Sequence, residues 1–324
     1  MNMINLTDNQ LNRYRTEGDQ LADDFVAFYF TQLDLKSKLD QELKALNCNK
    51  DWDLFLSAIP EAKWFHLDEA KIPTAILNSQ KQACTFYKNK EQYILQLLGL
   101  LSLPYCYAAA DGAMVLYQTE RMYKDVAKRL EETAVFITEM MNPLAFTPNG
   151  KGKILLFKVR LMHAAARFYI KKGNWDMQLG LPVNQEDMAG TNLSFSLLII
   201  RGLRKMGFTI KFEDQEHYIK YWSWIGSVLG LTEDLLPKNG KDAHDLELKI
   251  SERQFRASKE GMALTDSLLK CFYSLNDEKQ IKNKEISGFM RFLLGDKVAD
   301  ILNLPKDEFS FTKQLLLKIK VATV

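Results

Sequence analysis

The sequence predicts an all-α protein built as a single globular domain. Apolar residues recur with helical spacing along most of the chain, whereas the alternating patterns typical of strands are scarce. The segments between the apolar runs are polar and rich in glycine and proline, as loops between helices are. The 324 residues, 47% of them hydrophobic, suffice for one large domain with a sizeable core.

Eight segments have the periodicity of helices of roughly three to six turns. In chain order they are Leu21–Leu33, Ser79–Lys88, Tyr93–Leu103, Arg121–Met141, Ile154–Lys171, Glu186–Met206, Glu213–Leu229 and Gly261–Leu275. The stretch 211–220 mixes β-branched with polar residues, so its first half is not assigned. The loop at 236–242 is a possible domain boundary, but the apolar helix after it needs a surface to pack on. We therefore expect one domain over residues 1–324, with those after 237 as additional helices without a predicted role.

The bulk composition excludes several classes of protein. A net charge of +2, from 43 Lys and Arg against 41 Asp and Glu, leaves no electrostatic footprint for nucleic acid. The cysteines are far apart and form no CxxC pair, which fits a reducing compartment better than a disulfide framework. They are Cys48, Cys84, Cys106 and Cys271. The first residues have no apolar core of the signal-peptide kind, so we expect a soluble, cytoplasmic protein.

Two segments raise the question of membrane contact. Gln92–Ala110 is nineteen residues without a charge, but it contains polar residues and Pro104, and a buried helix explains it better than a membrane span. The last stretch, 311–324, is amphipathic and carries three lysines. We expect it to pack on the body of the protein, with contact to a membrane surface as the less favoured alternative.

Several familiar catalytic sites are absent from the sequence. It contains no GxGxxG, no GxxxxGK[ST], no GxSxG and no HExxH motif. A di-iron carboxylate bundle needs two ExxH pairs, and the nearest match, Asp214 with His217, occurs once. The four histidines and the absence of cysteine pairs leave a multi-histidine zinc site without support.

The segment KVRLMHAAARF, 158–168, places a histidine between two arginines. On a helix, Arg160, His163 and Arg167 recur at steps of three and four and share one face. One interpretation is a core histidine bonded to a neighbouring side chain, with both arginines paired to acids elsewhere. The other is a ligand site, because the flanking charges keep the imidazole neutral and the arginines require a dianion or two acids.

Haem meets both demands of the second interpretation. Its iron accepts an imidazole, and its two propionates accept guanidinium groups. The three small residues Ala164, Ala165 and Ala166 would let a flat macrocycle approach the helix closely. The residues alone leave both interpretations open.

Two further segments contain candidate site residues. KRLEET, 128–133, places Arg129, Glu132 and Thr133 on one helical face, although an exposed helix with an ion pair explains this equally. In PVNQEDMAGTNLSFS, 182–196, an asparagine N-cap precedes two acids that suit the helix dipole. Gly190 and Thr191 are small residues in a helix interior, which suggests close approach by another helix or a flat ligand.

Together, these three segments resemble the catalytic domain shared by rubber oxygenases (latex-clearing proteins) and the ER-bound oxygenases of the mycophenolic-acid type. Similar segments are GDQLADDFV at 18–26, YQTERM at 117–122 and YWSWIGSVLGLTEDLLP at 221–237. The resemblance thus runs from about residue 18 to about residue 237, roughly two-thirds of the chain.

The resemblance implies globin-like helix packing around a pocket for haem b, with His163 as the proximal iron ligand. Arg160 and Arg167 would hold the haem environment and the propionates, with Thr191 as a further cofactor-binding residue. Arg129 and Thr133 would lie on the helix over the pocket. Rubber-cleaving members are dioxygenases that add O₂ across an isoprenoid double bond and give carbonyl products.

The sequence departs from the rubber-cleaving pattern at Glu132, where that branch has a lysine able to cap the iron. A carboxylate would not replace this ligand, but it would serve as a base near bound O₂ if burial raised its pKa. The alternative is an ion pair with Arg129. The lack of a secretion signal argues against extracellular polyisoprene and favours a smaller hydrophobic substrate.

The predicted function is a haem-b-dependent oxygenase acting with O₂ on a hydrophobic, unsaturated or isoprenoid-like small molecule. The predicted catalytic residues are Arg129, Glu132 and Thr133. Two alternatives remain at this stage: a haem-binding sensor or carrier without turnover, and a haem-free helical protein whose arginines pair with acids.

Overall fold

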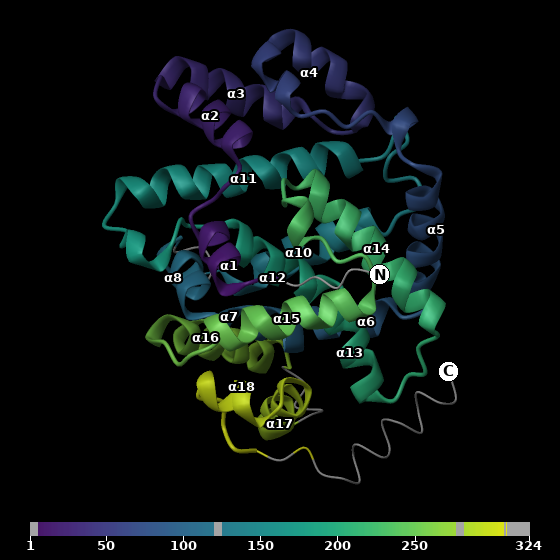
Figure 1. The fold of residues 1–324 in the computed structure, drawn as a ribbon, viewed down its shortest axis with the longest axis vertical. Coiled ribbons are helices and arrows are strands. Elements are labelled where there is room, and N and C mark those ends of the chain that lie inside the picture. The colour runs from purple at the N-terminus through teal and green to yellow at the C-terminus, as the bar shows by residue number, and fades with distance from the viewer. Residues whose placement is uncertain (1–5, 120–124, 277–281, 308, 310–324) are drawn as a thin grey trace.

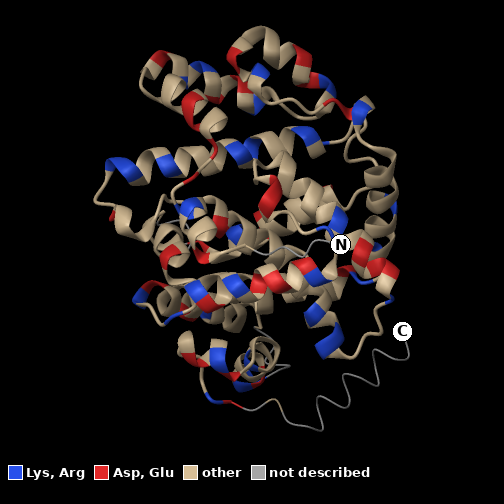
Figure 2. Cartoon of the chain, in the orientation of Figure 1, with Lys and Arg blue, Asp and Glu red and all other residues tan. Residues whose placement is uncertain are grey.

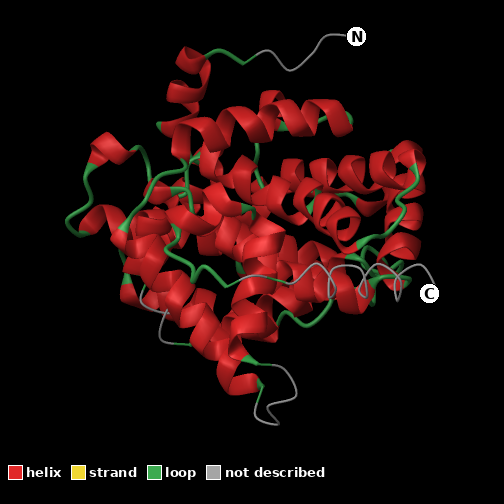
Figure 3. Cartoon of the chain, turned by 90° about the horizontal axis from the view of Figure 1, so that it is seen from below, coloured by secondary structure: helices red, strands yellow, loops and turns green. Residues whose placement is uncertain are grey.

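The computed structural model describes residues 6–119, 125–276, 282–307 and 309, and these segments form helices joined by loops (Figure 3). Their only β pairing is an isolated antiparallel bridge between Ala109 and Phe255. The predicted all-α class is confirmed.

The helices of the first half are α1 (Asp8–Arg15), α2 (Gln20–Phe30), α3 (Leu33–Ala45), α4 (Trp52–Ala58), α5 (Thr74–Lys88), α6 (Glu91–Leu97), α7 (Leu103–Tyr107), α8 (Ala110–Gln118) and α10 (Val126–Met140). Those of the second half are α11 (Gly152–Lys172), α12 (Gln185–Phe195), α13 (Leu197–Met206), α14 (Phe212–Val228), α15 (Gly240–Gln254), α16 (Lys259–Leu275), α17 (Asn283–Leu294) and α18 (Asp296–Ile301).

The long helix α11 divides the molecule into two parts (Figure 1). Helices α2, α3 and α4 lie on one side of it, and α2 packs directly against it. On the other side lie α10 and α12, followed by the layer of α7, α15 and α16, with α17 and α18 at the far end. Helices α5 and α14 pack along each other at the flank.

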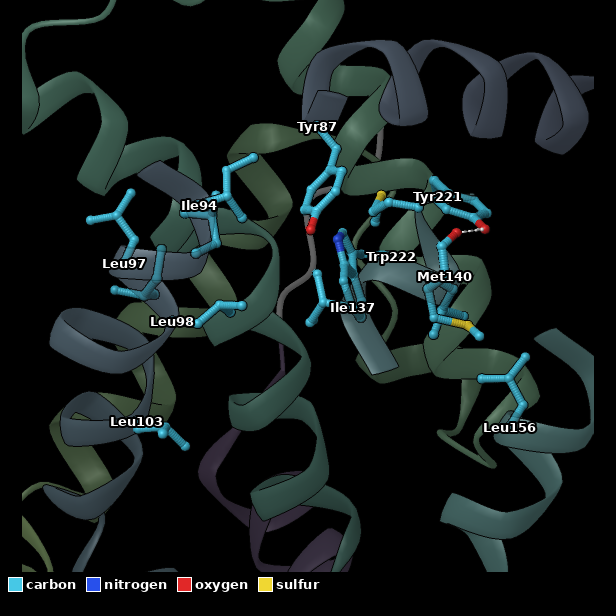
Figure 4. Packing of buried hydrophobic residues seen from close by; sticks show 14 of the residues in the cluster. Tyr87, Ile94, Leu97, Leu98, Leu103, Ile137, Met140, Leu156, Tyr221 and Trp222 are labelled. Carbon is cyan, nitrogen blue, oxygen red and sulfur yellow. Dashed lines mark hydrogen bonds between the residues drawn. The ribbon is translucent and has the colours of Figure 1, made fainter. Parts of the chain in front are cut away.

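A large hydrophobic core joins these layers. Figure 4 shows side chains from α5, α6, α10, α11 and α14 converging in it, among them Tyr87, Ile94, Ile137, Leu156 and Trp222. The hydroxyl of Tyr221 donates a hydrogen bond to the carbonyl of Met140 (2.7 Å), at the end of α10. This bond satisfies one of the carbonyls that a helix leaves free at its C-terminus.

The predicted helix Tyr93–Leu103 is interrupted. Between α6 and α7 the chain forms one π-helical turn, Leu98–Ser102. Pro104 explains the change, because proline has no N–H to donate and its ring collides with the carbonyl four residues earlier. Gly202 of α13 packs against this turn so closely that a Cβ there would lie 2.7 Å from Leu97 Cδ2.

The predicted helix Glu186–Met206 is two helices, α12 and α13, which meet at Ser196. Ser196 has φ −110° and ψ −81°, outside the helical range, and its hydroxyl bonds the carbonyl of Asn192 (3.0 Å). Ser194 likewise bonds the carbonyl of Thr191 (2.7 Å). Side chains of this kind compete with the helical hydrogen-bond ladder, and they concentrate at this break.

Several helices escaped prediction because their exposed faces are polar. The loop at 236–242 leads directly into one of them, α15, which Asn239 caps and which packs on α12, α13 and α14. Helix α14 begins at Phe212, so the first half of the stretch 211–220, for which no secondary structure was predicted, is helical from that residue on. The single-domain organisation stays a prediction, and the contacts of α15 support it.

The two segments considered for membrane contact have different outcomes. Within the described residues, no helix is both long and apolar enough to span a bilayer. The segment 311–324 lies outside the described residues, as does the predicted start of the fourth helix at 121–124.

Candidate functional site

Helix α11 carries His163 and both flanking arginines. It runs for 21 residues, and Lys171 and Lys172 in its last turn suit the negative end of the helix dipole. Its apolar residues, such as Phe157 and Leu161, are buried. The position of α11 in the middle of the molecule brings its charged residues into contact with α2 and with the loop before α12.

Arg160 forms a bidentate ion pair with Asp19, the N-cap residue of α2. Its Nε lies 2.5 Å from Asp19 Oδ2 and its Nη2 lies 2.9 Å from Oδ1. Its Nη1 donates to the carbonyl of Val228 (3.2 Å). A Cβ on Gly230, whose φ is +93°, would come within 2.7 Å of the Asp19 carboxylate, so only glycine lets this loop close over the pair.

Arg167 is 1% exposed, and only some of its guanidinium nitrogens have hydrogen-bond partners. Its Nε donates to Asp23 Oδ1 (2.6 Å) and its Nη1 to the carbonyl of Val183 (2.9 Å). Val183 holds this carbonyl in a left-handed conformation, φ +52°, which is costly for a β-branched residue. The remaining nitrogen, Nη2, is buried without a partner among the described residues.

Arg160 and Arg167 therefore have the acidic partners expected if His163 is an ordinary core histidine. His163 itself does not fit that interpretation. Its Nδ1 is buried and has no hydrogen-bond partner in the described part of the chain. Since buried polar atoms are nearly always bonded, this free nitrogen needs an explanation.

The imidazole of His163 is neutral. Burial is the main cause of the low pKa, which falls to about 3, and the charges of Arg167 and Arg129 lower it further. The carboxylate of Asp19 opposes them. The low pKa agrees with the expected neutral imidazole, with burial as a larger cause than the flanking arginines. The role of His163 as a ligand stays a prediction.

Arg129 of α10 lies in the same region as His163. Its charge acts on His163 and on Cys106 and Tyr107 of α7, which places these groups around it. Its Nε is buried without a partner among the described residues. The site thus contains three unpartnered polar groups, on Arg129, His163 and Arg167.

Thr133 and Glu132 occupy different environments although they are adjacent. Thr133 is half-buried, and its hydroxyl donates to the carbonyl of Arg129 (2.8 Å). Glu132 is exposed, so the burial required for its predicted role as a base is not found.

Helix α12 contributes Thr191 and two buried acids. Thr191 is exposed on an otherwise buried helix, and its hydroxyl donates to the carbonyl of Asp187 (2.9 Å). It lies close to the thiol of Cys106, which also contacts Ser194 (3.4 Å). Gly190 does not require glycine, because a Cβ there would meet only Ile250 at an ordinary 3.5 Å.

The two acids at the start of α12 belong to a buried ion-pair network that the sequence did not reveal. Glu186 is fully buried and binds Arg253 Nε (2.9 Å) and Arg15 Nη1 (3.5 Å). Arg15 also contacts Asp187 (3.2 Å) and Asp111 (3.1 Å). No local motif marks Arg15, because its partners lie on distant helices.

Asp187 is the most perturbed carboxyl group of this network. Burial raises its pKa to about 6, and the neighbouring carboxylates of Glu186 and Asp111 add to the shift, whereas Arg15 opposes it. A carboxyl group with such a pKa exchanges protons near neutral pH. The sequence had assigned Asp187 only to the helix dipole.

The site contains the neutral imidazole of His163 and the guanidinium groups of Arg129 and Arg167, each of which has a buried nitrogen without a partner among the described residues. Within the described residues, no group of three or more His, Cys, Asp and Glu side chains is arranged to hold a metal ion. A metal bound at His163 would therefore bring most of its own ligands, and two anionic groups on the same cofactor would suit Arg129 and Arg167. The donor set fits a haem.

Comparisons with known proteins identify the family of this chain. Residues 94–318 match the family described as ER-bound oxygenase mpaB/B'/Rubber oxygenase, catalytic domain. The match begins later than the predicted resemblance and extends beyond residue 237, into helices that had no assigned role. The rubber oxygenase of Streptomyces sp. (strain K30) is 25% identical over 225 residues, 68% of this chain and 54% of that protein. The match therefore spans about half the length of that relative.

A solved structure of latex clearing protein in the closed state has a similar fold. It superimposes with a TM-score of 0.78 over 96% of this chain and 85% of that one, at 21% sequence identity. At this identity the likeness concerns the fold, and it extends over nearly all of the helices described above.

Proposed function

The chain belongs to the family of ER-bound oxygenase and rubber oxygenase catalytic domains, and on this premise we propose that it is a haem-b-dependent oxygenase of a hydrophobic, unsaturated small molecule. The observation that carries the cofactor assignment is the neutral imidazole of His163, which is half-buried and whose Nδ1 is buried without a hydrogen-bond partner among the described residues. A haem iron would give this imidazole a partner.

Each proposed cofactor contact uses a group that is otherwise unsatisfied. His163 would hold the iron, and the free N–H groups of Arg167 and Arg129 would bind the two propionates. Arg160 has most of its donors engaged by Asp19 and Val228, so its role is to fix the haem environment by anchoring α11 to α2. The small residues Ala164–Ala166 leave room for the macrocycle.

The substrate side of the site suits an apolar molecule. The hydroxyl protons of Thr133 and Thr191 are both used by helix carbonyls, so these side chains offer methyl groups and no free donor. In the proposed reaction the two atoms of O₂ add to the two carbons of a double bond, which breaks to leave two carbonyl groups. Haem, when bound, supplies the iron at which O₂ is activated.

The addition of O₂ to the double bond requires no net proton, and the acid of this region that can exchange one is Asp187 and not Glu132. Asp187 is buried, and its pKa of about 6 lets it give or take a proton near neutral pH. Glu132 is exposed and stands where the rubber-cleaving pattern has a lysine, so it would neither hold the iron nor serve as a buried base.

The experiment that tests turnover is O₂ consumption by haem-reconstituted protein with a series of acyclic isoprenoid olefins. We expect consumption with an unsaturated substrate, carbonyl products by mass spectrometry, and none with the saturated analogue. Haem binding with no O₂ uptake across the series would contradict the oxygenase and favour a sensor or carrier.

A further inference from the structure

A second candidate site lies in a groove that contains none of the residues assigned to haem. The groove has a volume of about 760 Å³, within the range of small-molecule sites. It runs between α13, α15 and α18. Its lining residues are Tyr105, Leu197, Ile200, Arg201, Arg204, Lys205, Gln215, Gly240, His244, Glu247, Leu248, Ser251, Phe255, Lys297 and Val298.

The charges of this groove are strongly unbalanced. Four lining residues are Lys or Arg, and one is acidic. The acid, Glu247, is buried and already bonded by the hydroxyl of Tyr105 and by Arg201 Nη2 (2.6 Å). In Figure 2 the end of α13 that borders the groove is blue, whereas blue and red alternate along neighbouring α15.

Two of the four cations are bonded to other protein groups, and the other two have no ion pair among the described residues. Arg201 is paired with Glu247, and Lys205 donates to the carbonyls of Phe292 (3.2 Å) and Leu293 (2.8 Å). Arg204 and Lys297 are exposed and form no ion pair with any described residue. Burial lowers the pKa of Lys205, and the nearby charge of Arg201 lowers it further.

Apolar side chains lie beside the free cations. Leu197, Ile200 and Val298 form part of the wall, and Leu248 of α15 is 45% exposed toward solvent. A small inorganic anion would satisfy the charges but leave the exposed side chain of Leu248 uncovered. A neutral lipid would cover Leu248 but leave Arg204 and Lys297 unpaired.

We propose that this groove binds an amphipathic anion, a hydrocarbon chain that ends in a carboxylate or a phosphate. Arg204 and Lys297 bind the anionic head group, and the chain lies along Leu197, Leu248 and Val298. The site goes beyond the proposed oxygenase function, and it uses none of the groups assigned to haem.

The test is isothermal titration calorimetry of the purified protein with laurate and with dodecyl phosphate, both below the concentration at which micelles form. We expect saturable binding of at least one of them, which also identifies the preferred head group. Inorganic phosphate and dodecanol should bind at least tenfold more weakly. Equal binding of dodecanol would overturn the role of the cations, and equal binding of inorganic phosphate would overturn the role of the apolar wall.

Variants locate the binding in the groove. The double variant Arg204→Gln/Lys297→Gln should weaken binding by about tenfold, because two exposed charge contacts are lost. Leu248→Glu, at an exposed position that tolerates the change, should weaken it at least as much. The matched control Lys81→Gln/Lys88→Gln, two exposed lysines on α5, should bind like the unchanged protein. Absence of binding, or equal binding by all variants, would overturn the proposal.

His163→Ala separates this inference from the proposed function. It removes the proposed haem ligand on α11 and touches no residue of the groove. Laurate or dodecyl phosphate should therefore bind this variant with unchanged affinity. A loss of binding in His163→Ala would place the anion at the haem site and contradict the groove assignment.

Discussion

At the scale of single residues, the environment of His163 depends on which of the neighbouring arginines have acidic and hydrogen-bonding partners. Arg160 is neutralised by Asp19, whereas Arg167 keeps one free nitrogen and Arg129 another. The imidazole therefore lies between two incompletely paired cations and stays neutral. A site of this kind is costly without an anionic partner, because unpaired buried charges are strongly disfavoured.

Asp187 gives a prediction about pH. Its pKa in the folded protein is about 6 against an ordinary 3.8, so the folded state holds this proton more tightly than the unfolded state does. The resulting stabilisation is present below about pH 4 and is lost as the pH rises through about 6, with a full effect of about 3 kcal/mol.

The measurement is the free energy of unfolding of the unchanged protein and of Asp187→Asn from about pH 4 to about pH 7. The unchanged protein should lose stability relative to the variant across this interval. Asp53→Asn, at an exposed position on α4, serves as the control and should show no such trend. Parallel pH profiles for all three proteins would contradict the assignment.

At the scale of elements, strongly amphipathic segments were predictable and polar ones were not. The segments corresponding to α11, α14 and α16 have a continuous apolar stripe, and the structure forms them close to the predicted bounds, whereas α5 begins five residues before its predicted start. Nearly half of the residues of α15 are charged, and this helix owes its position to contacts with α12, α13 and α14, which no local pattern encodes. The π turn before α7 is the exception, because Pro104 in the sequence is its local cause.

The glycines of α12 and α13 provide a matched pair for testing this packing. Gly202→Ala should destabilise the protein by about 1–3 kcal/mol, because its Cβ would lie 2.7 Å from Leu97 Cδ2 and 2.8 Å from Leu101 Cδ2. Gly190→Ala should be neutral or stabilising by up to about 1 kcal/mol, since its Cβ has room and alanine favours helix. Chemical denaturation measures both, and equal effects would contradict the described contacts.

The ion pairs of Glu186 join α1 and α15 to α12. Glu186→Ala should destabilise the protein by about 3–5 kcal/mol, because Arg15 and Arg253 would lose a fully buried partner. Glu252→Ala removes an exposed carboxylate from the same helix as Arg253 and should change stability by less than about 0.5 kcal/mol. Similar losses in the two variants would show that the network contributes no specific stability.

At the scale of the whole molecule, the site is assembled from segments far apart in sequence. The stretch 158–168 indicated a ligand site, and the helical spacing of its charged residues survives in the structure. The partners of Arg160 and Arg167 could not be predicted, because Asp19 and Asp23 lie 141 and 144 residues away on α2. Arg15 and Asp187 were missed for the same reason, since only the tertiary fold brings α1, α8 and α12 together.

The central claim is that His163 binds a haem iron, and the visible spectrum after haem reconstitution tests it most directly. We expect a Soret band and about one iron per chain in the unchanged protein and in the control His66→Ala, whose histidine is exposed. His163→Ala should lose the band while keeping its helical circular dichroism. A Soret band of unchanged position and intensity in folded His163→Ala, or no band in any of the three proteins, would contradict the account.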